Sequence, residues 1–303
     1  MKTRINILHA LIFLLPSLFG MILFCFIPIT VSFFISMTNW RGMSRLSIFK
    51  GFFGFVKKNF TGFGNYAAIL KDHEIWRVLG HNLYFIVIYT PLMLVFSLLA
   101  AEIIASRRRG RGVYRVLYYL PVLTSWVAGA LIFRWVLNPV YGPINNFLAI
   151  FGISGPLWLQ SEVWAMPSIA IASVWKDMGF YGMIFLGGLL NISSEYYESA
   201  GIDGANAARK FFRITLPLLS PVTFYIIMLS LINSFLLFPQ IMVMTENAGP
   251  NGVTQVMVER IYRYAFVFGR MGYASALSWI LFVIIFAATV IQNFIQKKWV
   301  YYE

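Results

Sequence analysis

Charged residues are scarce in this chain of 303 residues. Asp, Glu, Lys and Arg together make up 12% of it, whereas 59% of the residues are hydrophobic. Soluble domains carry about 25% charged residues. The composition therefore excludes an ordinary soluble domain and predicts an all-α integral membrane protein built from apolar spans of about 20 residues each.

Cysteine, histidine and phosphate-binding motifs are also nearly absent. The single cysteine, Cys25, cannot form an intrachain disulfide or a cysteine-based metal site. The three histidines have no second ligand at metal-binding spacing, so we expect no metal. No Gly-Lys dipeptide occurs, which excludes a GxxxxGK[S/T] phosphate loop. We expect no catalytic residue and no cofactor bound by this chain, so any ATP must be bound by another polypeptide.

Acidic residues are outnumbered by basic ones, 11 to 24, giving a formal net charge of +13. A basic protein can bind nucleic acid, but here the Lys and Arg residues lie beside hydrophobic segments. Attraction to anionic lipid and the excess of positive charge in cytoplasmic loops explain that placement better. We therefore expect contact with membrane lipid and no contact with nucleic acid.

Long uncharged runs predict six transmembrane helices within one domain, residues 1–303. The first run is free of Asp, Glu, Lys and Arg from Ile5 to Trp40, which is longer than the apolar part of a signal peptide. Pro16 and Pro28 within it predict simple kinks. The fourth span contains Lys176 and Asp177, which need a partner or a wet cavity. The predicted spans are 10–37, 79–104, 116–137, 164–190, 218–245 and 272–296.

Basic residues favour a cytoplasmic location for both termini. The segments assigned to the inside carry twelve Lys or Arg and those assigned to the outside carry ten, so the totals decide little. Five arginines in the nine residues from Arg107 to Arg115 adjoin the end of a span, where the bias acts most strongly.

A polar segment, residues 195–217, lies between the fourth and fifth spans and contains ESAGIDGANAARKFFRITLP. Asp203-Gly204 predicts a turn between two short helices, with Asp203 able to cap the second. Phe211 and Phe212 can root the segment in the bundle, and Pro217 is expected to end it. Such a rigid projection can transmit displacement from a soluble motor. The alternative is an ordinary cytoplasmic loop lying on lipid headgroups.

The same segment resembles the EAA loop of binding-protein-dependent ABC importer permeases, whose pattern is EAAxxDGA, a spacer and IxLP. The chain has ESAGIDGA and then FRITLP, with Ser199 replacing an alanine. Residues 244–278 contain MTENAGPNGVTQVMVERIYRYAF and GYASALS, which are similar to stretches of carbohydrate-uptake permeases of the maltose-transporter type. Glu246-Asn247-Ala248 departs from the glycines usual there.

This resemblance implies a type I ABC importer permease fold in a bacterial inner or plasma membrane. It implies a second, usually nonidentical permease subunit, a dimer of ATPase subunits that bind ATP and Mg²⁺, an extracytoplasmic solute-binding protein and a sugar substrate. Glu198 would offer its carboxylate to a basic group on the ATPase. The coupling residues that it implies are Glu198, Ala200, Asp203, Gly204, Ala205, Leu216 and Pro217.

Polar and aromatic residues in the middle of two spans predict the substrate pathway, because sugars need hydrogen bonds and an apolar surface for their C–H faces. Asn233 has the alternative of holding two helices together. For Lys176 and Asp177 the alternative is an ion pair with each other or with the partner subunit. The pathway residues that we predict are Ser173, Asp177, Phe180 and Tyr181 in the fourth span, and Asn233 and Ser234 in the fifth.

Other functions stay open at this point. A membrane-embedded lipid or glycan transferase needs a cluster of carboxylates or histidines near one face, and the sequence suggests none. A passive channel would work without an ATPase. The outer loops carry ten Lys or Arg against five Asp or Glu, which leaves a permease for an acidic saccharide or another non-sugar solute as a further alternative.

Overall fold

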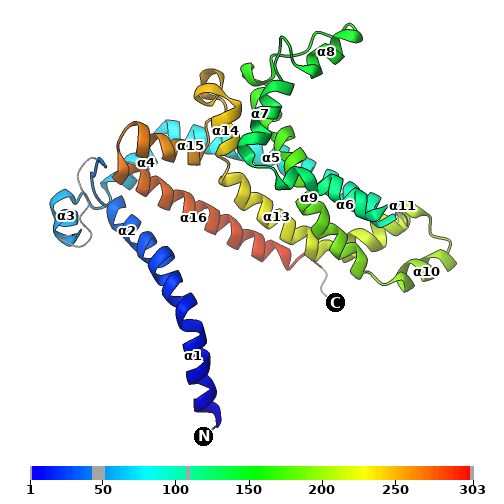
Figure 1. Ribbon diagram of the computed structural model, residues 1–303, viewed down its shortest axis with the longest axis horizontal. Coiled ribbons are helices and arrows are strands. Elements are labelled where there is room, and N and C mark those ends of the chain that lie inside the picture. The colour runs from blue at the N-terminus through cyan, green and yellow to red at the C-terminus, as the bar shows by residue number, and fades with distance from the viewer. Residues whose placement is uncertain (1, 43–51, 107–109, 301–303) are drawn as a thin grey trace. The chain divides into compact units, whose positions relative to one another are not determined.

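The computed structural model describes residues 2–42, 52–106 and 110–300 (Figure 1). In this part of the chain the secondary structure is helical apart from one isolated antiparallel bridge between Thr38 and Phe60. The fold class is therefore all-α, as the composition predicts. Arg107, Arg108 and Arg109 of the basic cluster lie outside the described residues.

The chain divides into two compact units. One comprises Met1–Ile75 and Ile261–Val283, and the other comprises Trp76–Arg260 and Ile284–Glu303. Three helices run across these boundaries: α5 (His73–Ser106), α15 (Met257–Tyr262) and α16 (Met271–Gln296).

The first unit begins with one long apolar helix. Pro16 lies inside its first part, and a π-turn directly precedes Pro28. The wider turn accommodates the backbone next to a residue that lacks an N–H, so the helix continues instead of breaking there. Besides its part of α16, the unit contains α1 (Lys2–Met21), η1 (Ile22–Phe26), α2 (Ile27–Ser36), α3 (Phe52–Asn59), α4 (Gly64–Lys71) and η6 (Arg263–Val267).

The second unit contains the remaining helices, and α9 is its most buried span, with 61% of its apolar window covered. Its elements besides α5, α15 and α16 are α6 (Arg111–Leu123), α7 (Trp126–Val136), α8 (Pro143–Ile150), η2 (Trp158–Gln160), α9 (Ala165–Asn191), α10 (Ser194–Ile202), α11 (Ala207–Lys210), η3 (Phe211–Thr215), α12 (Leu216–Leu218), α13 (Ser220–Phe235), α14 (Pro239–Met244), η4 (Glu246–Ala248) and η5 (Pro250–Gly252).

Glycines let α9 approach its neighbours closely. A side chain at Gly179 would collide with the backbone carbonyl of Tyr118 in α6, and one at Gly182 would lie 3.2 Å from the Ser97 carbonyl oxygen in α5. Small residues at such contacts let the helix backbones approach closely and attract each other by dispersion forces. This attraction matters in a bilayer because helices surrounded by apolar lipid tails gain no hydrophobic stabilisation by associating. α9 is thereby fixed against two other spans.

A buried asparagine joins three helices of the same unit. Asn82 in α5 donates from Nδ2 to the backbone oxygen of Ser234 in α13, at 3.2 Å, and its Oδ1 accepts from the backbone N–H of Met257 in α15, at 2.9 Å. The side chain is fully buried, so both bonds form in a low-dielectric environment where unpaired polar groups are costly.

Within the described ranges, four helices are each long and apolar enough to cross a membrane, and there are six candidates if two bent pairs count as one span each. The bent pairs are residues 112–123 with 126–136, at 96°, and residues 207–218 with 220–235, at 64°. The expected straight span 116–137 is thus two helices. The expected span 218–245 is interrupted after Phe235, where Leu236–Phe238 leaves the helix before α14 begins.

The break between α6 and α7 has an identifiable cause. Thr124 is extended and ends α6, and the Ser125 side chain caps α7 by accepting from the Ala128 N–H at 3.2 Å. Lys176 of α9 donates to the backbone carbonyls at this break, 3.2 Å from those of Pro121 and Val122 and 2.8 Å from that of Thr124. The carbonyls freed by the break are therefore satisfied by a charged donor from another helix.

Candidate functional site

The segment between α9 and α13 folds as two short helices around a tight corner. Gly204 has φ +75°, a left-handed conformation that suits glycine. Its N–H donates to the Gly201 carbonyl at 3.1 Å, and the Ala205 N–H donates to the Ala200 carbonyl at 2.9 Å. This pair of bonds is the Schellman arrangement that terminates α10. Asp203-Gly204 forms the turn that the sequence predicts.

Two local expectations for this segment are wrong. Asp203 ends α10 and does not cap the next helix; the Asn206 side chain caps α11 by accepting from the Arg209 N–H at 2.8 Å. Pro217 does not end the segment, because the helix runs on through a π-turn and α12 and bends only at Leu219. The wide π-turn gives the proline ring room that an ordinary α-turn would deny it.

The surface of this segment is mostly polar, with large apolar side chains exposed at Ile202 and Phe212. Glu198, Asp203 and Gly204 are exposed, whereas Ala200, Ala205, Leu216 and Pro217 are partly buried. Ile202 is 89% exposed at the corner. The Tyr197 hydroxyl lies 2.9 Å from that of Thr215 and joins α10 to η3, which stiffens the base of the projection. The segment therefore offers a carboxylate and an apolar contact on a braced support.

A cavity of about 260 Å³, here called the central pocket, lies where α5, α9, α13 and the starts of α7 and α14 meet. Four of the six predicted pathway residues line it: Ser173, Asp177, Asn233 and Ser234. Phe85, Tyr89 and Trp126 add aromatic rings, and Gln240 adds an amide. The middle of α9 thus faces a cavity with both hydrogen-bonding groups and apolar surfaces.

Hydrogen bonds fix the orientation of the polar groups there. The Tyr89 hydroxyl donates to Oδ2 of Asp177 at 2.7 Å, and Asn233 Nδ2 donates to the Tyr181 hydroxyl at 3.1 Å. Tyr89 is stacked on Phe85, with 5.1 Å between ring centroids. The Asp177 carboxyl is thereby held by a residue 88 positions away in sequence, which no local pattern indicates.

Two residues that line the central pocket each carry a buried oxygen with hydrogen-bonding capacity left over. Ser173 Oγ and Gln240 Oε1 have no protein partner among the described residues. Buried polar groups are usually bonded, so an unpaired one beside a cavity is suited to bind a polar molecule there. The chemistry of the pocket is that of a site for a hydroxylated, uncharged or weakly charged solute.

The structure separates the remaining predicted residues from this lining. Tyr181 is buried and does not line the pocket, although its hydroxyl accepts from Asn233, which does. Phe180 is 40% exposed, packs edge-on against Tyr181 and does not line the pocket. The four α9 positions therefore do not form one stripe, because Phe180 and Tyr181 are consecutive residues whose side chains point about 100° apart around the helix.

Lys176 and Asp177 do not pair with each other. Lys176 points to the break between α6 and α7, where it also lies 5.2 Å from the Trp126 ring centroid, and Asp177 points to Tyr89. Consecutive residues of a helix point about 100° apart, which allows the two opposite charges to serve different neighbours. Lys176 has a structural task that the sequence does not reveal, because its partners are backbone carbonyls.

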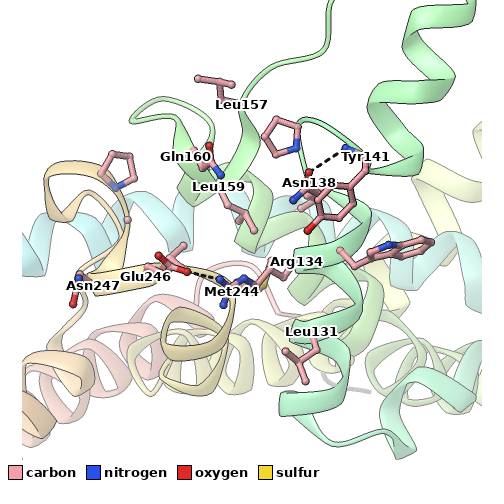
Figure 2. Close-up of a pocket in the computed structure, with 16 residues that line it drawn as sticks. Leu131, Arg134, Asn138, Tyr141, Leu157, Leu159, Gln160, Met244, Glu246 and Asn247 are labelled. Atoms are coloured by element: carbon pink, nitrogen blue, oxygen red, sulfur yellow. Dashed lines mark hydrogen bonds and ion pairs between the residues drawn. The ribbon is translucent and has the colours of Figure 1, made fainter.

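A larger cavity of about 620 Å³, here called the distal pocket, lies at the far ends of α7 and α14 (Figure 2). Arg134 of α7 and Glu246 of η4 reach toward each other across it and form an ion pair. Its other sides are formed by residues from three loops: Asn138, Pro139 and Tyr141, then Leu157, Leu159 and Gln160, and then Asn247, Gly249 and Pro250. The sequence alone does not indicate this pocket, since its residues come from three separate segments of the chain.

Comparison with known proteins gives a consistent result over nearly the whole chain. A family model described as binding-protein-dependent transport system inner membrane component matches residues 61–301, and a second, for a protein of unknown function, matches residues 7–70. The probable ABC transporter permease protein YesP of Bacillus subtilis (strain 168) is 34% identical, covering 96% of this chain and 91% of its own.

Two further similarities extend this result. The trehalose/maltose transport system permease protein MalF of Thermococcus litoralis is 31% identical, with coverage of 92% and 90%. A chain of a bacterial ABC transporter involved in the import of the acidic polysaccharide alginate superimposes with a TM-score of 0.78 at 22% identity, covering 98% of this chain and 96% of that one. The fold is that of a type I importer permease.

Proposed function

Because the chain belongs to the family of binding-protein-dependent transport system inner membrane components, and is a multi-pass permease of an ABC importer rather than an enzyme, we propose that it conducts a saccharide through the central pocket. One observation carries the choice of solute. Asp177, Asn233, Ser173 and Gln240 line a cavity that aromatic rings also line. Hydroxyl groups and C–H faces of sugars need that combination.

The solute that fits best is a neutral saccharide. Asp177 acts as an acceptor toward Tyr89, and no Lys or Arg lines the central pocket. A second carboxylate brought beside Asp177 would be repelled at low effective dielectric. The trehalose/maltose permease among the relatives carries such sugars by its name, which supports the same choice.

Coupling to ATP hydrolysis is assigned to residues 195–217. The exposed Glu198 carboxylate and the apolar Ile202 side chain offer two contacts to a soluble ATPase dimer that binds ATP and Mg²⁺. The Schellman corner at Gly204 and the bond between Tyr197 and Thr215 keep the projection stiff enough to transmit displacement. Ala200, Asp203, Ala205, Leu216 and Pro217 shape this support rather than contact the solute.

The remaining parts of the assembly follow from the same assignment. A second permease subunit completes the pathway, and an extracytoplasmic solute-binding protein delivers the saccharide. With residues 195–217 facing the ATPase in the cytoplasm of a bacterial cell, both termini lie on the cytoplasmic side. The distal pocket then opens on the extracytoplasmic side, because α7 leads away from the level of the central pocket.

Uptake by the complete assembly in liposomes tests this function. Glu198→Lys reverses the charge at the ATPase contact and should abolish ATP-driven saccharide uptake, while Glu195→Lys, on the first turn of the same helix, serves as the matched control. The assignment is wrong if the Glu198→Lys assembly transports at the rate of the unmodified one, or if uptake proceeds without ATP.

A further inference from the structure

The distal pocket and the central pocket lie along the same two helices. The central pocket is lined by Trp126 at the start of α7 and by Pro239 and Gln240 at the start of α14. The distal pocket is lined by Arg134 near the end of α7 and by Met244 at the end of α14. Eight helical residues separate Trp126 from Arg134, which is about 12 Å along the axis. The two pockets therefore lie at opposite ends of the same pair of helices.

The distal pocket combines the groups that a neutral saccharide needs. The ion pair of Arg134 and Glu246 presents donors and acceptors with no net charge, and its side chains are 47% and 80% exposed. Trp135 and Tyr141 also line the cavity and are exposed, so their rings are available to C–H faces of a ligand. A volume of about 620 Å³ lies within the range typical of small-molecule sites.

The backbone around the distal pocket is strained in a way that points to ligand binding. Among the described residues, non-glycine positive φ angles occur at four positions, Trp158, Asn247, Ala248 and Asn251. All four lie in, or next to, the two loops that form one side of this cavity. Asparagine tolerates this conformation better than Trp158 and Ala248 do, and residues strained in this way cluster at ligand clamps and functional sites.

Side-chain bonds hold these loops in that strained shape. Trp158 Nε1 donates to Oδ1 of Asn145 at 2.6 Å, and the Asn251 amide donates to the Glu162 carboxylate. The Thr245 and Thr254 hydroxyls lie 3.2 Å apart beneath the second loop. The walls of the pocket are thus preorganised, which lowers the entropy cost of binding a ligand.

We propose that the distal pocket is a second saccharide-binding subsite, which receives the solute before it passes along α7 and α14 to the central pocket. The inference rests on the proposed function, since it takes the same class of solute. The residues of the distal pocket lie at the ends of α7 and α14 and in the adjoining loops, not in the polar middle of the spans. It assigns ligand contact to Arg134, Glu246 and Trp135, none of which faces the central pocket.

Cysteine labelling in membrane vesicles containing the complete assembly tests this subsite. Cys25 is the single natural cysteine, so Cys25→Ser provides a cysteine-free chain. Gln160→Cys then reports on the distal pocket and Leu236→Cys on the central pocket. Val140→Cys is the matched control, since it is 82% exposed and lines neither pocket. The probes are a small maleimide and, one at a time, maltose, trehalose and arabinotriose, with sorbitol as the osmotic control.

The expected result is that a saccharide protecting Leu236→Cys also slows labelling of Gln160→Cys, by about tenfold at ten times its Kd, and leaves Val140→Cys unchanged. Protection at Gln160→Cys should persist when Asn233→Ala weakens the central pocket. If Leu236→Cys is protected and Gln160→Cys is not, the second subsite is refuted while the proposed function stands.

Two other outcomes also contradict the proposal. Protection of Gln160→Cys by the solute-binding protein without any further effect of saccharide would make the distal pocket a protein contact. If none of the three saccharides protects either cysteine, the saccharide assignment itself is wrong and the second subsite is lost with it.

Discussion

Lys176→Met removes the charged donor at the break between α6 and α7 while keeping a side chain of similar length. In the unmodified protein the ammonium group donates to the carbonyls of Pro121, Val122 and Thr124. The Pro121 carbonyl also accepts from Thr124 Oγ1 at 2.7 Å and so keeps a partner. The loss therefore falls on the other two carbonyls.

The size of the effect follows from those two acceptors. An acceptor left unpaired in a buried site costs about 1–3 kcal/mol, although bonds between membrane helices average only about 0.6 kcal/mol by double-mutant cycles. Taking about 1 kcal/mol for each carbonyl gives about 2 kcal/mol in all, which lowers the thermal midpoint by about 3 °C for a chain of this size.

Thermal unfolding of the purified assembly, followed by loss of helical circular dichroism, measures this change. Lys176→Arg is the control, because a guanidinium group retains several donors at the same site. We expect Lys176→Met to unfold at a lower temperature than the unmodified assembly and Lys176→Arg close to it. Equal midpoints for Lys176→Met and the unmodified assembly would refute the role assigned to Lys176.

Three further substitutions probe the packing and the coupling segment. Gly179→Ala should destabilise the assembly by about 1–3 kcal/mol because its Cβ would meet the Tyr118 carbonyl. Gly187→Ala in the same helix is the control and should leave stability unchanged, because nothing lies within 4 Å of that position. The thermal midpoints of the two variants are compared with that of the unmodified assembly. Gly204→Ala strains a left-handed residue by about 1–2 kcal/mol and should lower the saccharide transported per ATP hydrolysed, measured in liposomes; an unchanged ratio contradicts the coupling role. Asn82→Leu leaves two backbone groups unpaired and should lower stability by about 2 kcal/mol in chemical denaturation, and no loss would show that the bonds are replaced.

The helices of this protein follow from its hydrophobic runs, but their interruptions do not. The sequence around Thr124 and Ser125 is apolar on both sides, so the run predicts a single helix there. The carbonyls at the break are bonded by a lysine in another helix, and long-range partners of this kind leave no periodic signal. Likewise, Pro217 is expected to end a helix because proline lacks an N–H and its ring clashes with the preceding turn. The π-turn in the residues before Pro217 is wider and relieves that clash, so the helix continues.

The sequence predicts those residues of the candidate site that are polar and lie within an otherwise apolar span. Asp177, Asn233 and Ser173 stand out because polar groups inside spans are costly, and they line one pocket. Tyr89 and Trp126 were not predictable, since aromatic residues in apolar spans are common and carry no positional signal. Helical spacing predicts both Phe180 and Tyr181 as pathway residues. Spacing alone does not tell which of the two side chains lies on the side of α9 that faces the pocket.

Saccharide uptake by assemblies altered in the central pocket tests the central claim most directly. Asn233→Ala removes a group that lines the pocket, and Phe180→Leu is the matched control in a residue that faces away from it. ATP-driven uptake of labelled saccharide into liposomes should show a KM raised about tenfold for Asn233→Ala, corresponding to about 1.4 kcal/mol of lost binding. Phe180→Leu should leave the KM unchanged. An unaltered KM for Asn233→Ala would contradict the assignment of the central pocket as the path of the solute.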